Sequence, residues 1–181
     1  MIVREATVRD AAAIAAIYGH HVLHGLGTFE EVPPAVEEMA ARMAAVQGRG
    51  LPYLVAETTE AVIGFSYATP FRLRAAYRYT VEDSVYVAPG EAGRGVGKAL
   101  LAAVLERCAA LGLRQVFAVI GDSGNAGSIG AHRAAGFAHR GVMPAAGFKH
   151  GRWVDIVLMQ RALGPGGDAP PSAPGLDLIG V

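Results

Sequence analysis

The spacing of apolar residues in the first part of the chain changes from a strand pattern to a helical one. Residues 2–6 form a short β-branched run, which predicts a strand. Apolar residues then recur every three to four positions over residues 8–24 and again over residues 35–46, which predicts two amphipathic helices. Thr7, followed three positions later by the carboxylate of Asp10, is typical of a helix start. The pattern of this part is therefore β-α-α.

The pattern beyond residue 50 predicts a mixed sheet. Three runs of apolar, β-branched and aromatic residues predict an antiparallel meander at residues 53–58, 62–69 and 79–87. Two helices and three strands are predicted to follow, the helices at 98–111 and 125–135 and the strands at 115–120, 138–143 and 154–159. The chain is therefore expected to be α/β, with antiparallel strands first and one β-α-β crossover in the middle.

Length and composition limit the organisation of the chain. A chain of 181 residues has room for one core rather than two. The periodic pattern ends near residue 163, and residues 164–181 are rich in Gly and Pro, which predicts a linker or a surface tail. Near the end of this tail, Leu176, Leu178 and Ile179 are apolar and are expected to be able to dock.

Charge and cysteine content exclude several functional classes. Sixteen Lys and Arg balance sixteen Asp and Glu, so no overall basic field exists to hold nucleic acid or a membrane surface. Every stretch of eighteen residues is interrupted by a charge or a helix breaker, so a membrane span is not expected. Cys108 is alone, which excludes a disulfide framework and fits a reducing cytoplasm, and its helical register favours a buried residue over a nucleophile.

A glycine-rich segment, Gly93-Arg94-Gly95-Val96-Gly97, precedes the helix predicted at 98–111. Such a turn can hold an anion, because free backbone N–H groups and the positive end of the helix dipole face the ligand. Arg94 and Lys98 favour this interpretation over a tight turn alone. A Walker A loop is excluded, since Ala92 and Ala99 stand where that motif needs Gly and Ser or Thr, and the spacing also fails a dinucleotide-binding fingerprint.

Several other side chains admit two interpretations. His20 and His24 have the spacing of metal ligands, but no third ligand is evident, so favourable dipole interactions at a helix end are preferred. The segment Gly121-Asp122-Ser123-Gly124 looks like a serine protease motif, but its context between a strand and a helix favours a turn. Glu82 and Asp83 are adjacent on a predicted strand, so they point to opposite faces and one of them can face a pocket.

Three features follow one another along the chain: a strand with a carboxylate, a glycine-rich loop leading into a helix, and a second strand followed by a helix that begins at Asn125 and ends at Gly136. This order resembles that of the GNAT superfamily of N-acetyltransferases. Residues 2–163 are similar to its phosphinothricin acetyltransferase subfamily in five segments: His20-His21-Val22-Leu23-His24 with Gly27-Thr28-Phe29, Thr80-Val81-Glu82-Asp83-Ser84-Val85-Tyr86-Val87, Gly95-Val96-Gly97, Gly121-Asp122-Ser123-Gly124-Asn125 and Gly147-Phe148-Lys149-His150-Gly151-Arg152-Trp153. The resemblance implies a GNAT fold, with a mixed, mostly antiparallel sheet of about seven strands flanked by helices.

The resemblance also implies an activity. It is the transfer of an acetyl group from acetyl-CoA to the primary amine of a small amino acid analogue such as phosphinothricin, methionine sulfoximine or methionine sulfone, by direct attack and without a metal. A homodimer is expected. Two alternatives stay open: an acetyltransferase acting on a peptide N-terminus or another amine, and a non-catalytic acyl-CoA-binding module.

The resemblance assigns roles to particular residues. A lysine-like amine has a pKa of about 10.4 and must lose a proton before it attacks, so a general base is needed, and Glu82 is the expected one. His132 stands where the superfamily often has a Tyr that protonates the leaving thiolate, and it either acts as that acid or contacts CoA. Ala92 replaces a residue that commonly contacts the pyrophosphate, so one such contact is expected to be missing.

Acetyl-CoA is expected to contact one set of residues: Val85, Tyr86, Val87, Gly93, Arg94, Gly95, Val96, Gly97, Lys98, Asn125 and Ser128. A carboxylate and a phosphinate or sulfone on the acceptor need cations and apolar walls. The expected acceptor site consists of Phe29, Arg72, Arg74, Tyr77, Thr80 and Lys149.

Overall fold

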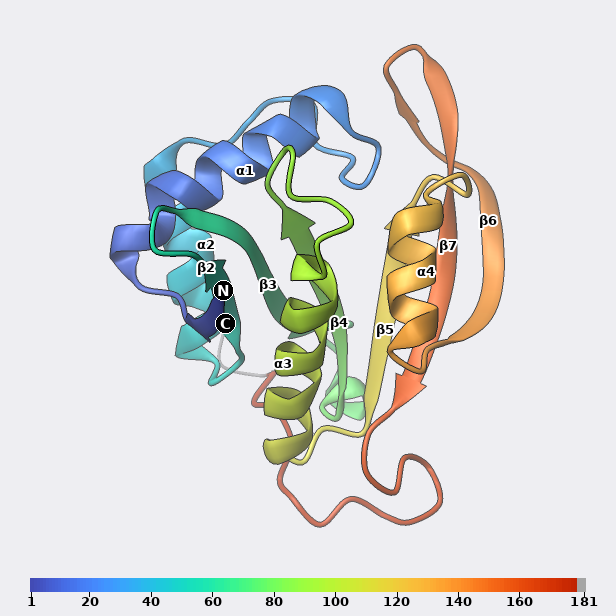
Figure 1. Ribbon diagram of the computed structural model, residues 1–181. Helices are drawn as coiled ribbons and strands as arrows, with labels where there is room; N and C mark the ends of the chain where they lie inside the picture. Colours follow the sequence, from blue (N-terminus) through green and yellow to red (C-terminus); the bar gives the residue numbers. More distant parts are fainter. Residues whose placement is uncertain (179–181) are drawn as a thin grey trace.

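Within residues 1–178, which the computed structural model describes, seven strands form one mixed sheet in the order β1-β2-β3-β4-β5-β7-β6 (Figure 1). The strands are β1 (Ile2–Glu5), β2 (Tyr53–Glu57), β3 (Val62–Pro70), β4 (Thr80–Val87), β5 (Gln115–Gly121), β6 (Ala138–Lys149) and β7 (Arg152–Ala162). β4 and β5 pair in parallel, and the other neighbouring pairs are antiparallel. The predicted α/β class, meander and single crossover are confirmed.

Helices pack on both faces of this sheet. They are α1 (Ala11–His24), α2 (Val36–Gly48), α3 (Val96–Ala110) and α4 (Ala126–Ala134), with short 3-10 helices η1 (Val8–Asp10) and η2 (Ala75–Tyr77). α3 packs on β2, β3 and β4 while α4 packs on β5, and Figure 1 shows both in front of the sheet. α1 and α2 pack on each other and on β3.

The faces of β3 and β4 follow from their contacts. The Ser66 hydroxyl donates to the Leu100 carbonyl on α3, whereas the Phe65 ring contacts Tyr18 on α1. Because Ser66 pairs with Val85 and side chains alternate along a strand, Asp83 and Val85 face α3, and Glu82 faces the side of α1. The expected opposite orientation of the two adjacent carboxylates is confirmed.

The core fills the space between sheet and helices. The predicted apolar face of α1 is buried, and on α3 the buried residues include Leu101, Leu105 and Cys108. Burial raises the pKa of the Cys108 thiol to about 12, so this thiol stays protonated at neutral pH and is not a nucleophile. The preferred interpretation of Cys108 as a buried small residue is confirmed.

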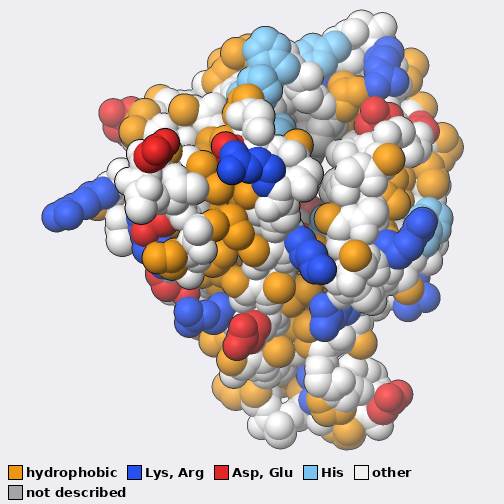
Figure 2. Space-filling view, in the orientation of Figure 1, with side chains coloured by type: hydrophobic (Ala, Val, Ile, Leu, Met, Phe, Trp, Pro, Cys, Tyr) orange, Lys and Arg blue, Asp and Glu red, His pale blue; other side chains and the backbone are white. Residues whose placement is uncertain are grey.

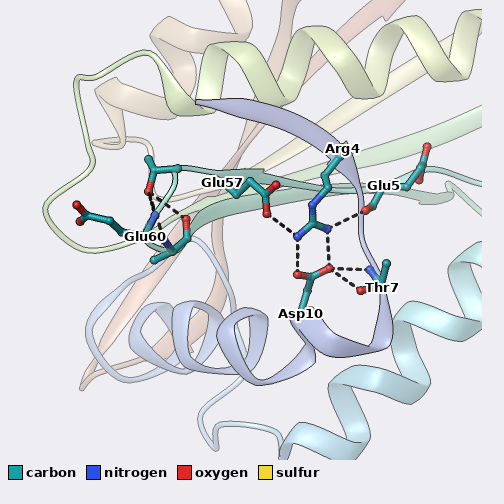
Figure 3. Close-up of polar contacts among 8 residues, drawn as sticks. Arg4, Glu5, Thr7, Asp10, Glu57 and Glu60 are labelled. Carbon is teal, nitrogen blue, oxygen red and sulfur yellow. Dashed lines mark hydrogen bonds and ion pairs between the residues drawn. The ribbon is translucent and has the colours of Figure 1, made fainter.

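The beginning of the chain is fixed by an ion-pair network (Figure 3). The Arg4 guanidinium donates to Asp10 Oδ2 at 2.8 Å and Oδ1 at 2.9 Å, and to Glu57 Oε2 at 2.6 Å. The Asp10 carboxylate also accepts the Thr7 N–H at 2.7 Å, which confirms the predicted helix start. The Arg4 hydrogen bonds lower the Asp10 pKa to about 2 against the effect of burial. The network therefore joins β1, β2 and the start of the first helix.

The last hairpin is longer than the pattern predicted. The predicted strands ended at residue 143 and began at 154, but β6 runs to Lys149 and β7 begins at Arg152. The pairing shifts register between Met143 and Gly147, and Ala145 there has a φ of 50°. This irregularity and the exposed small residues around it hide the alternation that identifies a strand.

The tail lies against the body of the protein. The buried Arg114 guanidinium donates to the carbonyls of Gly166 and Ala169, and the Tyr79 hydroxyl donates to the Ala173 carbonyl at 2.8 Å. Leu178 is buried, as expected, while Ile179 lies outside the described residues. Across residues 1–178, no helix has the length and apolar character needed to cross a membrane.

Candidate active site

A canyon opens where β4 and β5 separate. The two strands pair from Thr80 and Gln115 to Asp83 and Ala118, and beyond that point their pairing ends. Two adjoining cavities, of about 300 Å³ and 500 Å³, fill the gap and continue between α3 and α4. Figure 2 shows the surface hollowed in this region, with Lys and Arg side chains beside the hollow. We call the two cavities together the canyon.

The glycine-rich loop forms one end of the canyon. Gly93 and Gly95 have φ values of 78° and 82°, which favour glycine, and α3 begins at the next residue, Val96. A Cβ on either glycine would meet nothing within 4 Å, so the loop is open on that side. The backbone N–H groups at the start of the fifteen-residue helix α3 are therefore accessible to an anion such as a pyrophosphate.

Of the two predicted cations of this loop, Lys98 faces the canyon and Arg94 is paired with a carboxylate. Lys98 is exposed and lines the canyon. The Arg94 guanidinium donates to both oxygens of Glu91, at 2.8 Å and 3.0 Å, and Arg94 does not line the canyon. Lys98 is therefore the better placed of the two to meet a phosphate.

The β4 wall supplies backbone groups and apolar surface. Val85 and Val87 line the canyon, while the Tyr86 ring turns to the other face and contacts Tyr18 at a centroid distance of 5.0 Å. Nε2 of His21 lies 2.8 Å from the Val87 carbonyl and donates to it. Burial lowers the pKa of His21, so this ring is neutral at neutral pH. The end of β4 is thus held by α1, a contact that the sequence did not reveal.

The opposite wall is the start of α4. Asn125 Oδ1 accepts the Ser128 N–H at 3.1 Å and caps the helix, and both residues line both cavities of the canyon. The turn interpretation of the preceding segment is confirmed, because the Gly124 N–H donates to Asp122 Oδ1. Ser123 donates to Asp155 at 2.8 Å. The canyon is thus bounded by β4 on one side and by the start of α4 on the other, with the glycine loop at its end.

His132 is buried at the base of the canyon and contacts Asp83. Its Nε2 lies 3.0 Å from Asp83 Oδ2, and its Nδ1 donates to the Ser128 carbonyl at 2.8 Å. Burial alone would lower the pKa of His132, but the hydrogen bond and the charge of Asp83 outweigh it and raise that pKa. The sequence identified His132 but not its partner, because Asp83 lies 49 positions away and looked like any strand carboxylate.

Glu82 lies on the other face of β4, at the same point of strand separation. It is half-buried and pairs across the sheet with Thr69 on β3 and Phe117 on β5. Burial, with a smaller effect from the neighbouring Asp83, raises the pKa of Glu82, and the positive charge of Arg72 opposes the increase. Thr80, two residues earlier, is half-buried on the same face. A half-buried carboxylate with a raised pKa accepts a proton more readily than an ordinary glutamate does.

The loop between α1 and α2, residues 25–35, covers this face and is held by side chains from three elements. Nζ of Lys149 donates to the Thr28 carbonyl at 2.7 Å, and Lys149 is only 1% exposed. The Tyr18 hydroxyl contacts Thr28 Oγ1 and Glu30 Oε1, each at 2.8 Å, and Arg42 donates to Glu30 at 2.6 Å. Lys149, expected to touch the acceptor, is placed here as a support for the loop.

Two strand glycines let this loop approach the sheet. A Cβ on Gly121 would lie 2.0 Å from the Leu26 carbonyl oxygen, and one on Gly147 would lie 2.4 Å from the Phe29 ring. Phe29 therefore packs against β6 while staying 40% exposed. Sequence reasoning missed these contacts, although a glycine inside a strand is a known signal of close approach.

The segment between β3 and β4 brings further predicted residues near Glu82. Arg72, Arg74 and Tyr77 are exposed and line a separate hollow of about 550 Å³. The Arg72 guanidinium lies 4.4 Å from the Phe71 ring centre, and that ring stacks on Phe117 at 4.5 Å. Aromatic contacts thus connect Arg72 with the strand pair that carries Glu82.

Arg152, in the last segment of the resemblance, and the two histidines of α1 lie apart from Glu82. Arg152 forms an ion pair with Asp122 at 3.2 Å. The His20 and His24 rings on α1 lie with their centres 4.8 Å apart and their planes tilted by 47°. Among residues 1–178, no group of three or more His, Cys, Asp or Glu is placed to hold a metal ion. His24 lies in the last turn of α1, as the helix-end interpretation expects, whereas His20 lies before that turn.

Comparisons with known proteins identify the family of this chain. The model of the Acetyltransferase (GNAT) family matches residues 20–137. A phosphinothricin N-acetyltransferase from Alcaligenes faecalis is 54% identical over 157 residues, which cover 87% of this chain and 80% of the relative. An L-methionine sulfoximine/L-methionine sulfone acetyltransferase from Pseudomonas paraeruginosa is 40% identical over 93% of this chain and 98% of the relative.

A solved structure shows the same fold around its ligand. The crystal structure of a GNAT superfamily phosphinothricin acetyltransferase from Sinorhizobium meliloti, in complex with acetyl-CoA, has a TM-score of 0.92 and 49% identity, and the match covers 94% of this chain and 92% of that one. In that protein the fold binds acetyl-CoA. The chain belongs to the GNAT family of acetyltransferases and is an acetyl-CoA-dependent N-acetyltransferase.

Proposed function

We propose that this protein transfers the acetyl group of acetyl-CoA directly to the primary amine of a small amino acid analogue, with Glu82 as the general base. The observation that carries the proposal is the placement of Glu82. It lies where β4 and β5 separate, on the face opposite Asp83 and the canyon. An acceptor amine on that face meets the thioester through the gap between the two strands.

Each wall of the site has a distinct task in this reaction. Backbone groups of β4 and the N–H groups before α3 hold the pantetheine arm and the pyrophosphate. Glu82 takes a proton from the ammonium of the acceptor, directly or through a water, so that the free amine attacks. A backbone N–H near Val87 stabilises the negative charge that develops on the carbonyl oxygen. When bound, acetyl-CoA supplies the activated acetyl group.

The acceptor class is supported by the cations and rings near Glu82. Arg72 and Arg74 can bind a carboxylate and a phosphinate or sulfone, since guanidinium groups match such paired oxygens. Phe29 and Tyr77, each 40% exposed, provide apolar walls. Phosphinothricin, methionine sulfoximine and methionine sulfone combine these features, and both named relatives take their names from acceptors of this class.

The proposal is tested by following release of the CoA thiol against a panel of amines. The panel contains phosphinothricin, methionine sulfoximine, methionine sulfone, ordinary amino acids and short peptides, with a Cys108→Ala variant to control for the protein's own thiol. We expect saturable turnover with the three analogues. Turnover with peptides alone would support transfer to a peptide N-terminus instead. CoA binding without any turnover would indicate a binding module.

We also propose that the protein is a homodimer formed through β6. β6 is an edge strand, and apolar side chains on it and on the adjoining β7 are exposed, including Met143 (50%), Phe148 (58%) and Trp153 (64%). A long, apolar, exposed edge is a surface on which a second copy of the chain can pair.

Sedimentation velocity at micromolar concentration should show a dimer for the wild type and a monomer for Trp153→Asp. Val32→Asp is the matched control, because Val32 is 77% exposed and lies outside the β6 edge. It should stay dimeric. A monomeric wild type would rule out this interface.

A further inference from the structure

Three polar side chains form a continuous chain that ends in the canyon. Asp83 Oδ2 contacts His132 Nε2 at 3.0 Å, and His132 Nδ1 lies 3.4 Å from the Ser128 hydroxyl. The side chains of Asp83 and His132 are 1% and 7% exposed, whereas Ser128 is half-exposed and lines both canyon cavities. This series of contacts therefore leads from the buried Asp83 carboxylate to Ser128 at the wall of the canyon.

The hydrogen bonds determine which atoms of His132 and Ser128 donate a proton and which accept one. Nδ1 must carry a proton, because its partner at 2.8 Å is the Ser128 carbonyl, which only accepts. The Ser128 oxygen then accepts from the same N–H, so its own proton is free to point into the canyon. Both ring nitrogens of His132 are occupied, and the ring presents no free N–H to a ligand.

We propose that Asp83, His132 and Ser128 form a proton relay that protonates the departing CoA thiolate, with the Ser128 hydroxyl as the group that touches sulfur. This inference rests on the proposed function. As the new C–N bond forms and the C–S bond breaks, Ser128 Oγ–H gives its proton to sulfur and the proton on His132 Nδ1 moves to Oγ. The ring is left neutral, with Nε2–H still donating to Asp83.

The proton balance closes over one turnover. The acceptor loses two protons. Glu82 takes the first from the ammonium before attack and passes it to water, and then takes the second from the nitrogen of the tetrahedral intermediate. The CoA thiolate gains one proton from the relay, so each turnover releases one proton to the solvent. Exchange with water then returns Glu82 to its ionised form and His132 to its protonated form. Asp83 is a positioning residue, because it holds the ring and stabilises its cationic form without touching the substrate.

The ion-pair partner of His132 is Asp83, at 3.0 Å, and other titratable groups lie near this pair. His21, Glu91 and Lys98 line the same cavity as His132, and Glu82 and Cys108 lie near Asp83. The burial of Cys108 keeps its thiol neutral, and His21 is neutral and bonded to Val87. Removing the Asp83 charge should therefore shift the titration of His132 directly.

The first test measures protonation without turnover. Nitrogen-15 NMR of the histidine rings in wild type and Asp83→Asn, with and without CoA, reports the pKa of His132. We expect both ring nitrogens of wild-type His132 to carry protons at neutral pH. In Asp83→Asn the midpoint should move to lower pH. An unchanged midpoint would overturn the role of Asp83.

The second test separates acid catalysis from packing. Single-turnover rates are measured with acetyl-CoA and with its selenoester analogue, whose selenolate is a much weaker base and leaves without a proton. Ser128→Ala should lose about 10²-fold with acetyl-CoA, and most of that loss should disappear with the selenoester. Ser123→Ala is the matched control, since its hydroxyl contacts Asp155 outside the canyon, and its rates should be unchanged.

The outcomes distinguish the relay from the reaction on which it rests. If the wild type acetylates an amine but Ser128→Ala loses the same factor with both donors, or loses nothing, the relay is wrong and the proposed function stands. If the wild type transfers acetyl to no amine of the panel, the proposed function is wrong and the relay falls with it. The rate of the wild type should fall at alkaline pH as His132 loses its proton. In Asp83→Asn this fall should begin at a lower pH than in the wild type.

Discussion

Replacing Glu82 with glutamine is expected to lower kcat/KM for phosphinothricin at neutral pH by about 10²- to 10⁴-fold, the usual range for loss of a general base. Glutamine keeps the shape of the side chain but accepts no proton. The variant should recover part of the rate as the pH rises toward the pKa of the amine, because the acceptor then deprotonates unaided. Binding of CoA should not change, since Glu82 lies on the face opposite the canyon.

The wild-type pH profile provides a second check on Glu82. The reaction needs its ionised form, so the rate is present above the Glu82 pKa and lost as the pH falls through it. Because burial raises that pKa, the acidic limb should lie above the ordinary value for Glu, and it should vanish in Glu82→Gln. Glu60→Gln, an exposed change in the β2–β3 turn, is the control. A variant profile identical to the wild type would disprove the assignment.

Replacing Arg72 with alanine is expected to raise KM for phosphinothricin by about 10- to 100-fold, which corresponds to the loss of about 1.5–3 kcal/mol for hydrogen bonds to a charged group. The Arg72 charge also lowers the Glu82 pKa. Its removal should therefore move the acidic limb of the profile to higher pH. The rise in KM and the shift of the acidic limb are expected together only if Arg72 lies beside both the acceptor and Glu82.

A matched change separates this effect from the loss of any surface cation. Arg140 is also exposed, but it donates to Gln160 at 2.9 Å on the β6–β7 hairpin, so Arg140→Ala should leave both KM and the acidic limb unchanged. Steady-state kinetics over a pH series gives both quantities in one experiment. An unaltered KM together with an unmoved limb for Arg72→Ala would place the acceptor elsewhere.

Part of the active site was predictable because local patterns define it. Glycines at positive φ before a helix indicate an anion-binding loop, and alternation along β4 places Glu82 and Asp83 on opposite faces. The segment from Gly121 to Asn125 has the turn chemistry that starts α4. These features depend on neighbouring residues, so the sequence contains all the information that they need.

Other parts of the site depend on contacts between distant residues. The buried Lys149 supports the loop at Thr28, 121 positions away, and Arg94 is paired with Glu91 instead of facing the canyon. A lysine near a pocket looks the same in a sequence whether it touches a ligand or a carbonyl. The length of the last hairpin was also missed, since its bulge breaks the alternation.

The sequence by itself determined the α/β class, the order of strands and helices, the glycine loop and the candidacy of Glu82 and His132. Only the tertiary structure decided that His132 is paired with Asp83, that the canyon lies where β4 and β5 separate, and that the α1–α2 loop is held in place by Lys149 and Tyr18. The physical reason is the range of the interactions. Helix, strand and turn preferences act over a few residues, whereas burial and ion pairing depend on which distant segments the fold brings into contact.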